Sequence, residues 1–326
     1  MKYQLNSAKG IINRIHPCKP VGRNNMKKTV TAVAPYIYKG GLNFKNKPFE
    51  AWRELGLPTV RGWYPRQLHK LMFNVDMPTL WQGEARLVFV QPVSLYFDTF
   101  FTAMTHEMIP FIWDCWPKYD DRVIGWLKFH RVKTCIFTCK QAAERIQNAI
   151  PNLNVLVIPE GLDTERYKAG KELKDRSIDL YTYGRLKESL LKKNHPSLHI
   201  ERNGDFKTLL ARIQDAKVTI ALPRCDVEPE LTGGQETLTQ RYWECMLSRM
   251  VMVGRAPKEL VDFIGYNPVI DIDYENYEAQ IKDIVAHIES YQELVDKNRE
   301  VALRMAPWEI RMKQVMEWLV SLGYEV

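Results

Sequence analysis

Residues 217–254, "KVTIALPRCDVEPELTGGQETLTQRYWECMLSRMVMVG", carry the pattern that decides the fold. An apolar run at 217–222 leads through a loop with Gly and Pro into a helical segment at 237–248, and a second apolar run follows at 250–254. Strands without polar alternation that are joined through a helix are typical of parallel sheets covered on both faces. The stretch therefore predicts a β-α-β unit of an α/β domain.

The same alternation extends along most of the chain. The further strands that it predicts are 28–34, 86–91, 110–114, 133–138, 154–159, 177–183, 197–201 and 267–272. The further helices that it predicts are 93–108, 120–131, 140–149, 205–216, 257–264, 275–303 and one within 306–323. The pattern runs twice, with a charged seam at 158–177, and so indicates two Rossmann-like α/β units.

Composition is that of a soluble globular protein: of 326 residues, 45% are hydrophobic and 11% aromatic. Apolar runs such as 86–97 are shorter than the roughly 20 residues of a membrane span. Residues 1–17 are too polar for a signal peptide, so we expect a cytoplasmic protein. The six cysteines form no CxxC pair and no zinc-like cluster, and we interpret them as buried free thiols.

The net charge of +7 is unevenly distributed. Residues 1–70 hold 14 Lys and Arg against Glu50 and Glu54 alone, whereas the rest of the chain holds 32 basic and 37 acidic residues. A basic segment favours an anionic partner, which would be lipid headgroups, a phosphorylated substrate or nucleic acid. A solvated surface without a partner explains the charge equally well.

Two glutamates, Glu236 and Glu244, lie eight positions apart in "GGQETLTQRYWECMLSR" (233–249). A spacing of eight residues also arises by chance, so only the position of the two glutamates in the fold can show whether they share a function. Ligands of parallel α/β sheets bind at the carboxyl ends of the strands, where a Gly-rich loop opening into a helix presents amides to an anion. Glu244 lies inside the helix, and because an unpaired carboxylate is costly there, we expect it to have a hydrogen-bonding partner.

A second segment, "YTYGRLKESLLKK" (181–193), follows the first strand of the second unit. Gly184 permits a tight turn, and Arg185 adds a bidentate donor. The nearby lysines are Lys187, Lys192 and Lys193. We interpret this cluster as a phosphate or diphosphate site, with an ordinary solvated surface as the alternative.

In this order, three elements resemble the donor-binding domain of retaining, nucleotide-sugar-dependent glycosyltransferases of the GT-B fold. "VLVIPEGLDTERY" (155–167) resembles the interdomain segment of this family, and "YTYGRLKESLLKK" resembles its Gly-Arg…Lys diphosphate element. "ETLTQRYWECMLSRMVMVG" (236–254) resembles its E-x7-E helix and the following strand. The resemblance implies two Rossmann-like domains that face one another across a cleft.

The resemblance also implies domain limits. Residues 1–160 would form the acceptor-binding domain and 161–305 the nucleotide-sugar domain. Residues 306–326 would form a helix that returns to the N-terminal domain, and Trp308 and Leu319 belong to its apolar face.

The resemblance further implies roles for individual residues. Glu236 would bind hydroxyls of the donor sugar, and Glu244 would bind the ribose. The residues assigned to the donor diphosphate and its surroundings are Gly184, Arg185, Lys192, Lys193, Thr237, Leu238, Thr239 and Arg241. In the N-terminal half, Asp114 in "PFIWDCWPKY" (110–119) would face the sugar, and Gly40 and Gly41 would form a glycine loop beside the phosphates. His106 is interpreted as an ordinary helical residue.

The sequence departs from the family pattern at three places. "ETLT" stands where glycines follow the first Glu, and "LSR" (247–249) replaces a small residue and a glycine. Leu190 stands where the family has its lysine. We expect no metal ion and no cofactor, because Arg185, a lysine and helix N-terminal amides would stabilise the leaving diphosphate.

The leading hypothesis is a cytoplasmic glycosyltransferase that uses a nucleoside-diphosphate-sugar, acts with retention, and touches an anionic membrane peripherally. Its acceptor would be a glycan, a lipid-linked glycan or a protein. One alternative is an epimerase-like GT-B enzyme, although the sequence shows no identifiable acid/base pair for such a reaction. Two others are a non-catalytic GT-B scaffold and a nucleic-acid-binding protein using Trp52, Trp63 and Tyr64. Nucleic acid is the less favoured partner.

Overall fold

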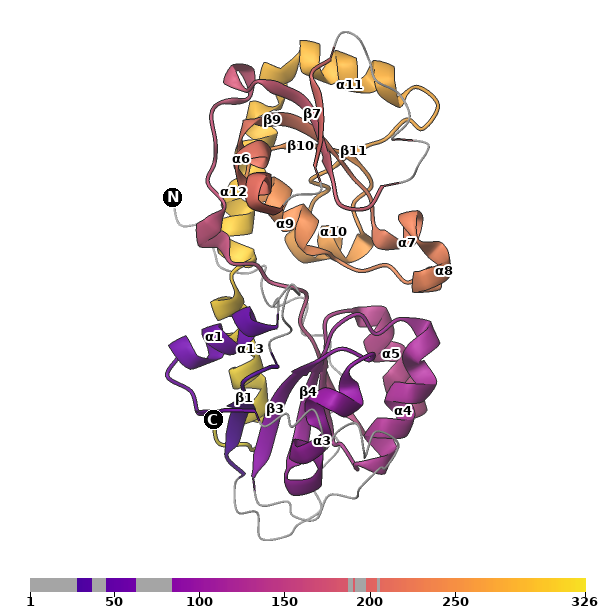
Figure 1. The fold of residues 1–326 in the computed structure, drawn as a ribbon, viewed down its shortest axis with the longest axis vertical. Helices are drawn as coiled ribbons and strands as arrows, with labels where there is room; N and C mark the ends of the chain where they lie inside the picture. Colours follow the sequence, from indigo (N-terminus) through magenta and orange to yellow (C-terminus); the bar gives the residue numbers. More distant parts are fainter. Residues whose placement is uncertain (1–27, 37–44, 63–83, 187–189, 191–197, 204–205) are drawn as a thin grey trace.

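The protein folds into two α/β lobes, which lie one above the other along the long axis (Figure 1). The computed structural model describes residues 28–36, 45–62, 84–186, 190, 198–203 and 206–326. Each lobe contains one sheet, and every strand pairing in both sheets is parallel. The predicted two-domain α/β fold is therefore confirmed.

The first sheet has the strand order β2-β1-β3-β4-β5-β6. Its strands are β1 (Val30–Val33), β2 (Thr59–Val60), β3 (Ala85–Val90), β4 (Glu107–Ile112), β5 (Thr134–Phe137) and β6 (Asn154–Val157). Its helices are α1 (Asn46–Glu54), α3 (Leu95–Thr105), α4 (Asp120–Phe129) and α5 (Lys140–Ala149). All of β4 is buried, and alternate residues such as Phe111 and Ile112 join the cores on opposite faces of the sheet.

The second sheet has the order β11-β10-β9-β7-β8. Its strands are β7 (Ile178–Tyr183), β8 (Ile200–Asn203), β9 (Ala216–Ala221), β10 (Val251–Gly254) and β11 (Ile270–Asp271). Its helices are α6 (Phe206–Asp215), α7 (Arg224–Val227), α8 (Pro229–Thr232), α9 (Gln240–Leu247), α10 (Lys258–Ile264), α11 (Tyr277–Ala286) and α12 (Gln292–Met305). The β-α-β unit predicted from 217–254 is β9-α9-β10, with α7 and α8 inserted in its loop.

The prediction of a single helix over 275–303 is wrong. The structure has α11, a short 3-10 turn at Ile288–Tyr291, and then α12. The break allows Ile288 to join Ile281, Ile284 and Val295 in one apolar cluster. The sequence contains no Gly or Pro in this segment to announce the turn.

Other elements also differ from the prediction. The helix expected from 237 begins at Gln240, because side chains from elsewhere bind the amides of Glu236 and Leu238. The helix expected over 93–108 ends at Thr105, so that His106 is its C-cap and β4 begins at Glu107. Within 35–85, where the sequence pattern is irregular, the structure adds α1 and β2.

The last helix, α13 (Trp308–Ser321), packs back on the N-terminal domain as expected (Figure 1). Trp308, Met312, Val315 and Leu319 are buried with core residues of the first sheet. The chain crosses between the lobes after β6 and again between α12 and α13. These two crossings lie side by side, because the Leu162 N–H donates to the Ala306 carbonyl at 2.8 Å. No described helix is long and apolar enough to cross a membrane.

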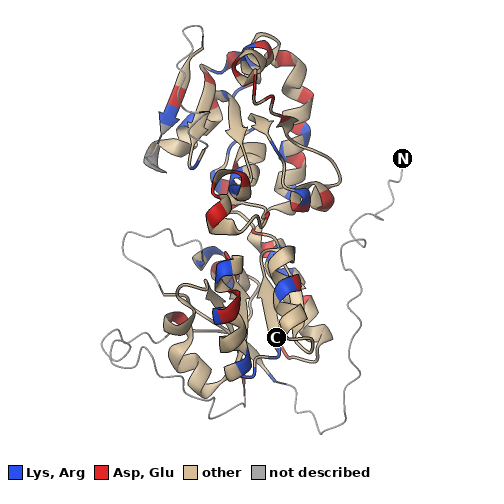
Figure 2. Ribbon diagram, turned by 90° about the vertical axis from the view of Figure 1, so that its right-hand side faces the viewer, with Lys and Arg blue, Asp and Glu red and all other residues tan. Residues whose placement is uncertain are grey.

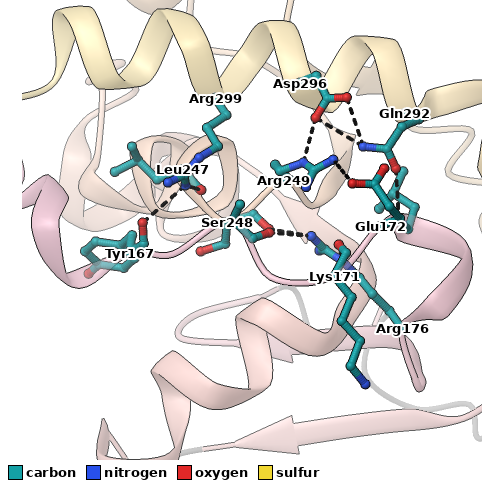
Figure 3. A network of polar contacts seen from close by, with 12 residues as sticks. Tyr167, Lys171, Glu172, Arg176, Leu247, Ser248, Arg249, Gln292, Asp296 and Arg299 are labelled. Atoms are coloured by element: carbon teal, nitrogen blue, oxygen red, sulfur yellow. Dashed lines mark hydrogen bonds and ion pairs between the residues drawn. The ribbon is translucent and has the colours of Figure 1, made fainter.

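A polar network fastens the seam after the first crossing to the second domain (Figure 3). Arg176 is buried and donates to the carbonyls of Ala216 and Ser248 at 2.7 and 2.9 Å. Arg299 of α12 donates to the carbonyls of Tyr167 and Leu247. The bonds to Leu247 and Ser248 use carbonyl groups at the end of α9 that have no partner within that helix.

Arg249 occupies the position after α9 with φ = 57°, in the left-handed region that favours glycine. This is the place where the family pattern has a glycine. Its guanidinium forms ion pairs with Glu172 at 2.8 Å and Asp296 at 2.6 Å, so the side chain joins the seam to α12 (Figure 3). The ion pairs offset the backbone strain.

The five cysteines in the described part of the chain are buried free thiols, as predicted. Cys135 lies in the core of the first sheet, where burial raises its pKa well above the usual range. A thiol that stays protonated is a poor nucleophile and a poor metal ligand. Cys135 is therefore a core residue.

We expect Arg249→Gly to be more stable than Arg249→Ala by about 1 kcal/mol, because both lose the ion pairs and only alanine keeps the left-handed strain. Both should be less stable than wild type by about 1–2 kcal/mol. Urea denaturation gives the free energy of unfolding. The exposed Arg304→Ala on α12 is the control, expected within about 0.5 kcal/mol of wild type. Equal stability of the alanine and glycine variants would show that the position is unstrained.

Candidate functional site at the domain junction

Carboxyl ends of strands from both sheets meet where the two lobes join. On the second sheet, β7 ends before Arg185, β9 before Arg224 and β10 before Arg255. On the first sheet, the residues that follow the strands β4, β5 and β6 are Asp114, Cys139 and Glu160. Figure 2 shows acidic and basic segments in both lobes where they meet. This is the edge at which parallel α/β sheets bind ligands.

Direct contacts join the two edges. Arg224 places Nη1 3.8 Å from Asp114 Oδ1, and its guanidinium lies 5.2 Å from the centre of the Trp116 ring. Gln141 Oε1 accepts the Glu236 N–H at 2.9 Å. The Cys139 thiol donates to the Glu236 carbonyl at 3.3 Å. The segment around Glu236 therefore rests on the start of α5.

Gly184 forms the predicted tight turn, with φ = 67°. This left-handed backbone favours glycine, and a Cβ there would lie 2.0 Å from Arg241 Nη2 and displace that guanidinium from the turn. Arg241 also donates to the Arg185 carbonyl at 3.0 Å and lies over the Tyr183 ring at 5.3 Å. Arg241 thus fixes the turn that presents Arg185.

The Arg185 side chain is 62% exposed, with Nε 3.4 Å from Glu228 Oε1. The other oxygen of Glu228 accepts from Arg224 Nε at 2.8 Å. One glutamate therefore holds two arginines near each other. Arg185 remains accessible to a ligand.

Glu236 points toward α10. Its carboxylate accepts the Lys258 N–H at the helix start at 2.7 Å and pairs with Arg255. Arg255 is held in turn by a bidentate pair with Asp226, with both N–O distances at 2.7 Å. The Glu236 side chain is 17% exposed. Two of its roughly four lone-pair sites are in use, so others stay available to hydroxyl groups.

The loop after Glu236 is extended, and Thr237 and Thr239 are half-buried in it. The Leu238 N–H donates to Glu259 Oε2 at 3.1 Å, and Glu259 Oε1 accepts the Lys140 N–H at 3.1 Å. Burial raises the pKa of Glu259. This carboxylate links the loop to the first residue of α5, so one of the amides assigned to a diphosphate is bound by the protein itself.

Glu244 has protein partners, as expected for a carboxylate beside the sheet. The Tyr167 hydroxyl donates to Oε1 at 3.0 Å, and the Tyr183 hydroxyl donates to Oε2 at 3.1 Å. Burial raises the pKa of Glu244, while the two hydroxyls act in the opposite direction. The tyrosines hold the side chain at the carboxyl end of β7.

Asp114 also lies at the junction, with φ = 50°. Left-handed backbone at a non-glycine residue is frequent at ligand sites. Gln91 Nε2 donates to its Oδ2 at 2.8 Å. Burial raises the pKa of Asp114, against the effect of Arg224, Gln91 and Arg185.

Sequence analysis passed over three residues of this site: Glu160, Arg224 and Arg255. Each lies directly or closely after a predicted strand, and this position could have identified it from the sequence. Arg255 pairs with Asp226 and Glu236, and Arg224 lies near Asp114 of the other domain, so no local motif marks these residues. Burial raises the pKa of Glu160 to about 8, and the carboxylates of Asp114 and Glu259 add to this effect.

Several predicted residues fall elsewhere. Lys187, Lys192, Lys193, Gly40, Gly41, Trp63 and Tyr64 lie outside the described residues. Leu190, at the position of the family lysine, is buried in an apolar cluster and supplies no cation. Trp52 is fully buried and donates to the Pro58 carbonyl at 3.0 Å, so it cannot stack on a nucleic-acid base.

Within the described part of the chain, no three His, Cys, Asp or Glu side chains are grouped as a metal ion requires. The sequence does contain an Asp-x-Asp pair, Asp271 and Asp273, which the expectation of no metal did not consider. Asp273 accepts the amides of Glu275 and Asn276 at 3.0 and 3.1 Å and shapes the turn before α11.

No protein-family model and no curated protein sequence matches this chain. Solved structures do match it. Sucrose-phosphate synthase from Thermosynechococcus elongatus is 11% identical with a TM-score of 0.60, over 91% of this chain and 99% of that one. HepE from Anabaena, crystallised in complex with UDP, is 9% identical with a TM-score of 0.57, over 90% and 100%.

A DNA-modifying β-glucosyltransferase, crystallised with and without uridine diphosphoglucose, is 11% identical with a TM-score of 0.50, over 90% of this chain and 99% of that one. Likeness at such low identity establishes the fold. With two parallel-sheet domains and a last helix that returns to the first domain, this chain has the GT-B fold.

Proposed function

We propose that the protein is a glycosyltransferase that moves a sugar from a nucleoside-diphosphate-sugar to an acceptor, with retention of anomeric configuration and without a metal ion. The observation that carries the proposal is the set of arginines at strand ends of the second domain. Arg241 fixes the Gly184 turn, Arg185 extends from it, and Glu228 couples Arg185 to Arg224. Planar guanidinium groups match the geometry of a diphosphate.

The arginines suit the chemistry of the leaving group. Breaking the bond between the anomeric carbon and the diphosphate oxygen leaves negative charge on the diphosphate. Fixed positive groups directed at the place where charge develops stabilise the transition state more than the ground state. Arg185 and Arg224 both follow carboxyl ends of strands at the junction, which supports this role.

Two carboxylates suit the neutral parts of the donor. Glu244, oriented by Tyr167 and Tyr183, retains acceptor capacity for ribose hydroxyls. Glu236, which is paired with Arg255, would accept hydrogen bonds from hydroxyl groups of the sugar. The charge assistance strengthens such bonds relative to neutral pairs. The HepE structure with UDP and the β-glucosyltransferase structure with uridine diphosphoglucose support a nucleotide-sugar as ligand.

We place the acceptor at the N-terminal domain, on the side of Asp114. A glycan, a lipid-linked glycan and a protein all remain compatible with this arrangement. The basic balance of residues 1–70 favours an acceptor that is phosphorylated or lies at an anionic membrane, and the protein would work at the cytoplasmic face.

We expect one nucleoside diphosphate among UDP, GDP, ADP and dTDP to raise the melting temperature most. Saturation at about 100 times the dissociation constant adds about 2.7 kcal/mol to the free energy of unfolding. Arg185→Ala should weaken this stabilisation and lower transfer about 100-fold, because it removes a donor to the diphosphate. Glu236→Ala should lower transfer while leaving the stabilisation by the free diphosphate in place. Differential scanning fluorimetry and a transfer assay over nucleotide-sugars measure these effects.

Arg212→Ala on α6 is the matched control, since this arginine pairs with Glu201 away from the junction. It should leave binding and transfer unchanged. If no nucleoside diphosphate stabilised the wild type, the proposed donor site would be wrong. A sugar released with altered ring stereochemistry but without transfer would instead favour the epimerase-like reaction.

We expect chelation with EDTA to leave transfer unchanged, because guanidinium groups supply the charge that a divalent cation supplies in metal-dependent enzymes. Asp273→Asn, in the Asp-x-Asp pair, serves as a second test and should also keep full activity. Loss of transfer in EDTA that Mg²⁺ or Mn²⁺ restores would contradict the metal-free mechanism.

A further inference from the structure

Arg311 lies on α13, at the place where this helix contacts the second lobe. Its helix neighbours Trp308, Met312 and Val315 belong to the core of the first lobe. Its guanidinium carbon lies 4.7 Å from the centre of the Phe263 ring, which belongs to α10 of the second lobe. The Arg311 side chain is therefore part of the contact between the two lobes.

The guanidinium group of Arg311 is buried without a compensating charge. The residue is 1% exposed, and in the described part of the chain neither its Nε nor its Nη2 has a hydrogen-bond acceptor. Burial lowers its pKa to about 9, no charged group of the described residues adds to this effect, and the side chain stays cationic at neutral pH. A buried charge without a partner costs free energy.

Arg176 gives the comparison, because it is also buried but fully bonded (Figure 3). It donates four hydrogen bonds to backbone carbonyls, at 2.7 to 3.0 Å. Arg311 has one aromatic ring in place of these bonds, and a ring face compensates a buried guanidinium only in part. Replacing a buried charge by an apolar side chain of similar volume is often neutral or stabilising. We therefore expect Arg311 to weaken the contact between α13 and α10.

A second buried polar group without partners lies at another contact between the lobes. Gln235 is 3% exposed, and both polar atoms of its side-chain amide lack a hydrogen bond to any described residue. The residues around it in the chain touch the first lobe. A Cβ at Gly233 would lie 3.0 Å from Pro117, and the Glu236 N–H donates to Gln141 Oε1 at 2.9 Å. Two separate parts of the lobe contact thus hold polar groups that water would satisfy.

Arg311 could be satisfied by a bound anion, or by water that reaches it when the lobes part. An anion site combines several donors or charges, whereas no second charged group acts on Arg311 in the described part of the chain. Phe263 is half-buried, so the contact lies near the surface and a small separation admits water. These observations favour water.

We propose that Arg311 and Gln235 keep the contact between the lobes weak, so that the lobes part and close again while each stays folded. Parting exposes both side chains to water, and closing buries them without partners. The two crossings, joined at Leu162 and Ala306, keep the lobes connected. One consequence rests on the proposed glycosyl transfer: opening of the junction would set the rate at which the nucleoside diphosphate leaves.

Cys139 can report the opening, because its thiol is buried and donates to the Glu236 carbonyl of the other lobe at 3.3 Å. In the native protein, iodoacetamide should alkylate Cys139 faster than Cys135. The latter lies in the core of the first sheet and reacts only when that lobe unfolds. Mass spectrometry of peptides measures the two rates separately.

We expect Arg311→Met to slow the alkylation of Cys139 about tenfold or more, because methionine fills a similar volume without a charge and still contacts Phe263. Alkylation of Cys135 should not become faster, which shows that the first lobe stays folded. Lys313→Met is the matched control, because Lys313 is exposed on the same helix, and it should match the wild-type rates. Gln235→Met should slow the alkylation of Cys139 severalfold.

Further variants and readouts separate the charge from the packing. Arg311→Leu repeats the test with a second apolar side chain, whereas Arg311→Lys keeps the charge and should keep the wild-type rate. Small-angle X-ray scattering should give a smaller radius of gyration for Arg311→Met than for wild type. The preferred nucleoside diphosphate should dissociate more slowly from Arg311→Met, by about the factor found for Cys139.

Equal or faster alkylation of Cys139 in both Arg311→Met and Arg311→Leu would overturn the proposal. A wild type in which Cys139 reacts no faster than Cys135 would do the same. Inorganic phosphate that stabilised the wild type but not Arg311→Met would assign Arg311 to an anion site instead. If alkylation were slowed as expected but no nucleoside diphosphate bound, the proposed function would fail and the role of Arg311 would stand.

Discussion

The close packing of Gly161 against α13 determines how the two domains meet. The absence of a side chain at Gly161 allows the Trp308 ring and the Ala306 carbonyl to approach the chain, at distances where a Cβ would lie 2.8 and 2.9 Å away. The Leu162 N–H then bonds the Ala306 carbonyl at 2.8 Å, which brings the outgoing and returning segments together. Both crossings are thereby confined to one point, and the strand ends of the two sheets are directed toward each other. The placement of Asp114, Glu160 and Arg224 at one junction depends on this contact.

The positive charges at the junction come from loops after different strands and not from a single sequence motif. The family pattern uses a lysine five residues after the arginine, but Leu190 is buried at that position and contributes to the core of the second sheet. Arg224, from the loop after β9, and Arg255, from the end of β10, supply positive charge from other strand ends. Because parallel strands present all their carboxyl ends at one edge, a cation lost from one loop can be supplied by another.

The fold was predictable because apolar runs and helical periods repeat with little ambiguity. The ends of strands could also be predicted, and Asp114 and Arg185 lie beside them. The orientation of side chains could not be predicted: Glu236 turns toward Arg255 and α10, and this depends on contacts between distant segments. Arg249 is a similar case, since the sequence showed only that a glycine was missing, whereas its left-handed backbone is offset by Glu172 and Asp296, which lie 77 and 47 positions away. Long-range partners of polar residues leave no local pattern to read.

The three described arginines that follow β7, β9 and β10 each have a carboxylate partner, and this bears on how a diphosphate could bind. Arg185 and Arg224 share Glu228, and Arg255 is paired with Asp226 and Glu236. The Leu238 amide is bound by Glu259. Partly exposed ion pairs contribute only about 0–1 kcal/mol each, so exchanging a carboxylate for a phosphate oxygen costs little. A diphosphate brings more charge than one carboxylate and binds several donors at once, so it can displace Glu228 from Arg185.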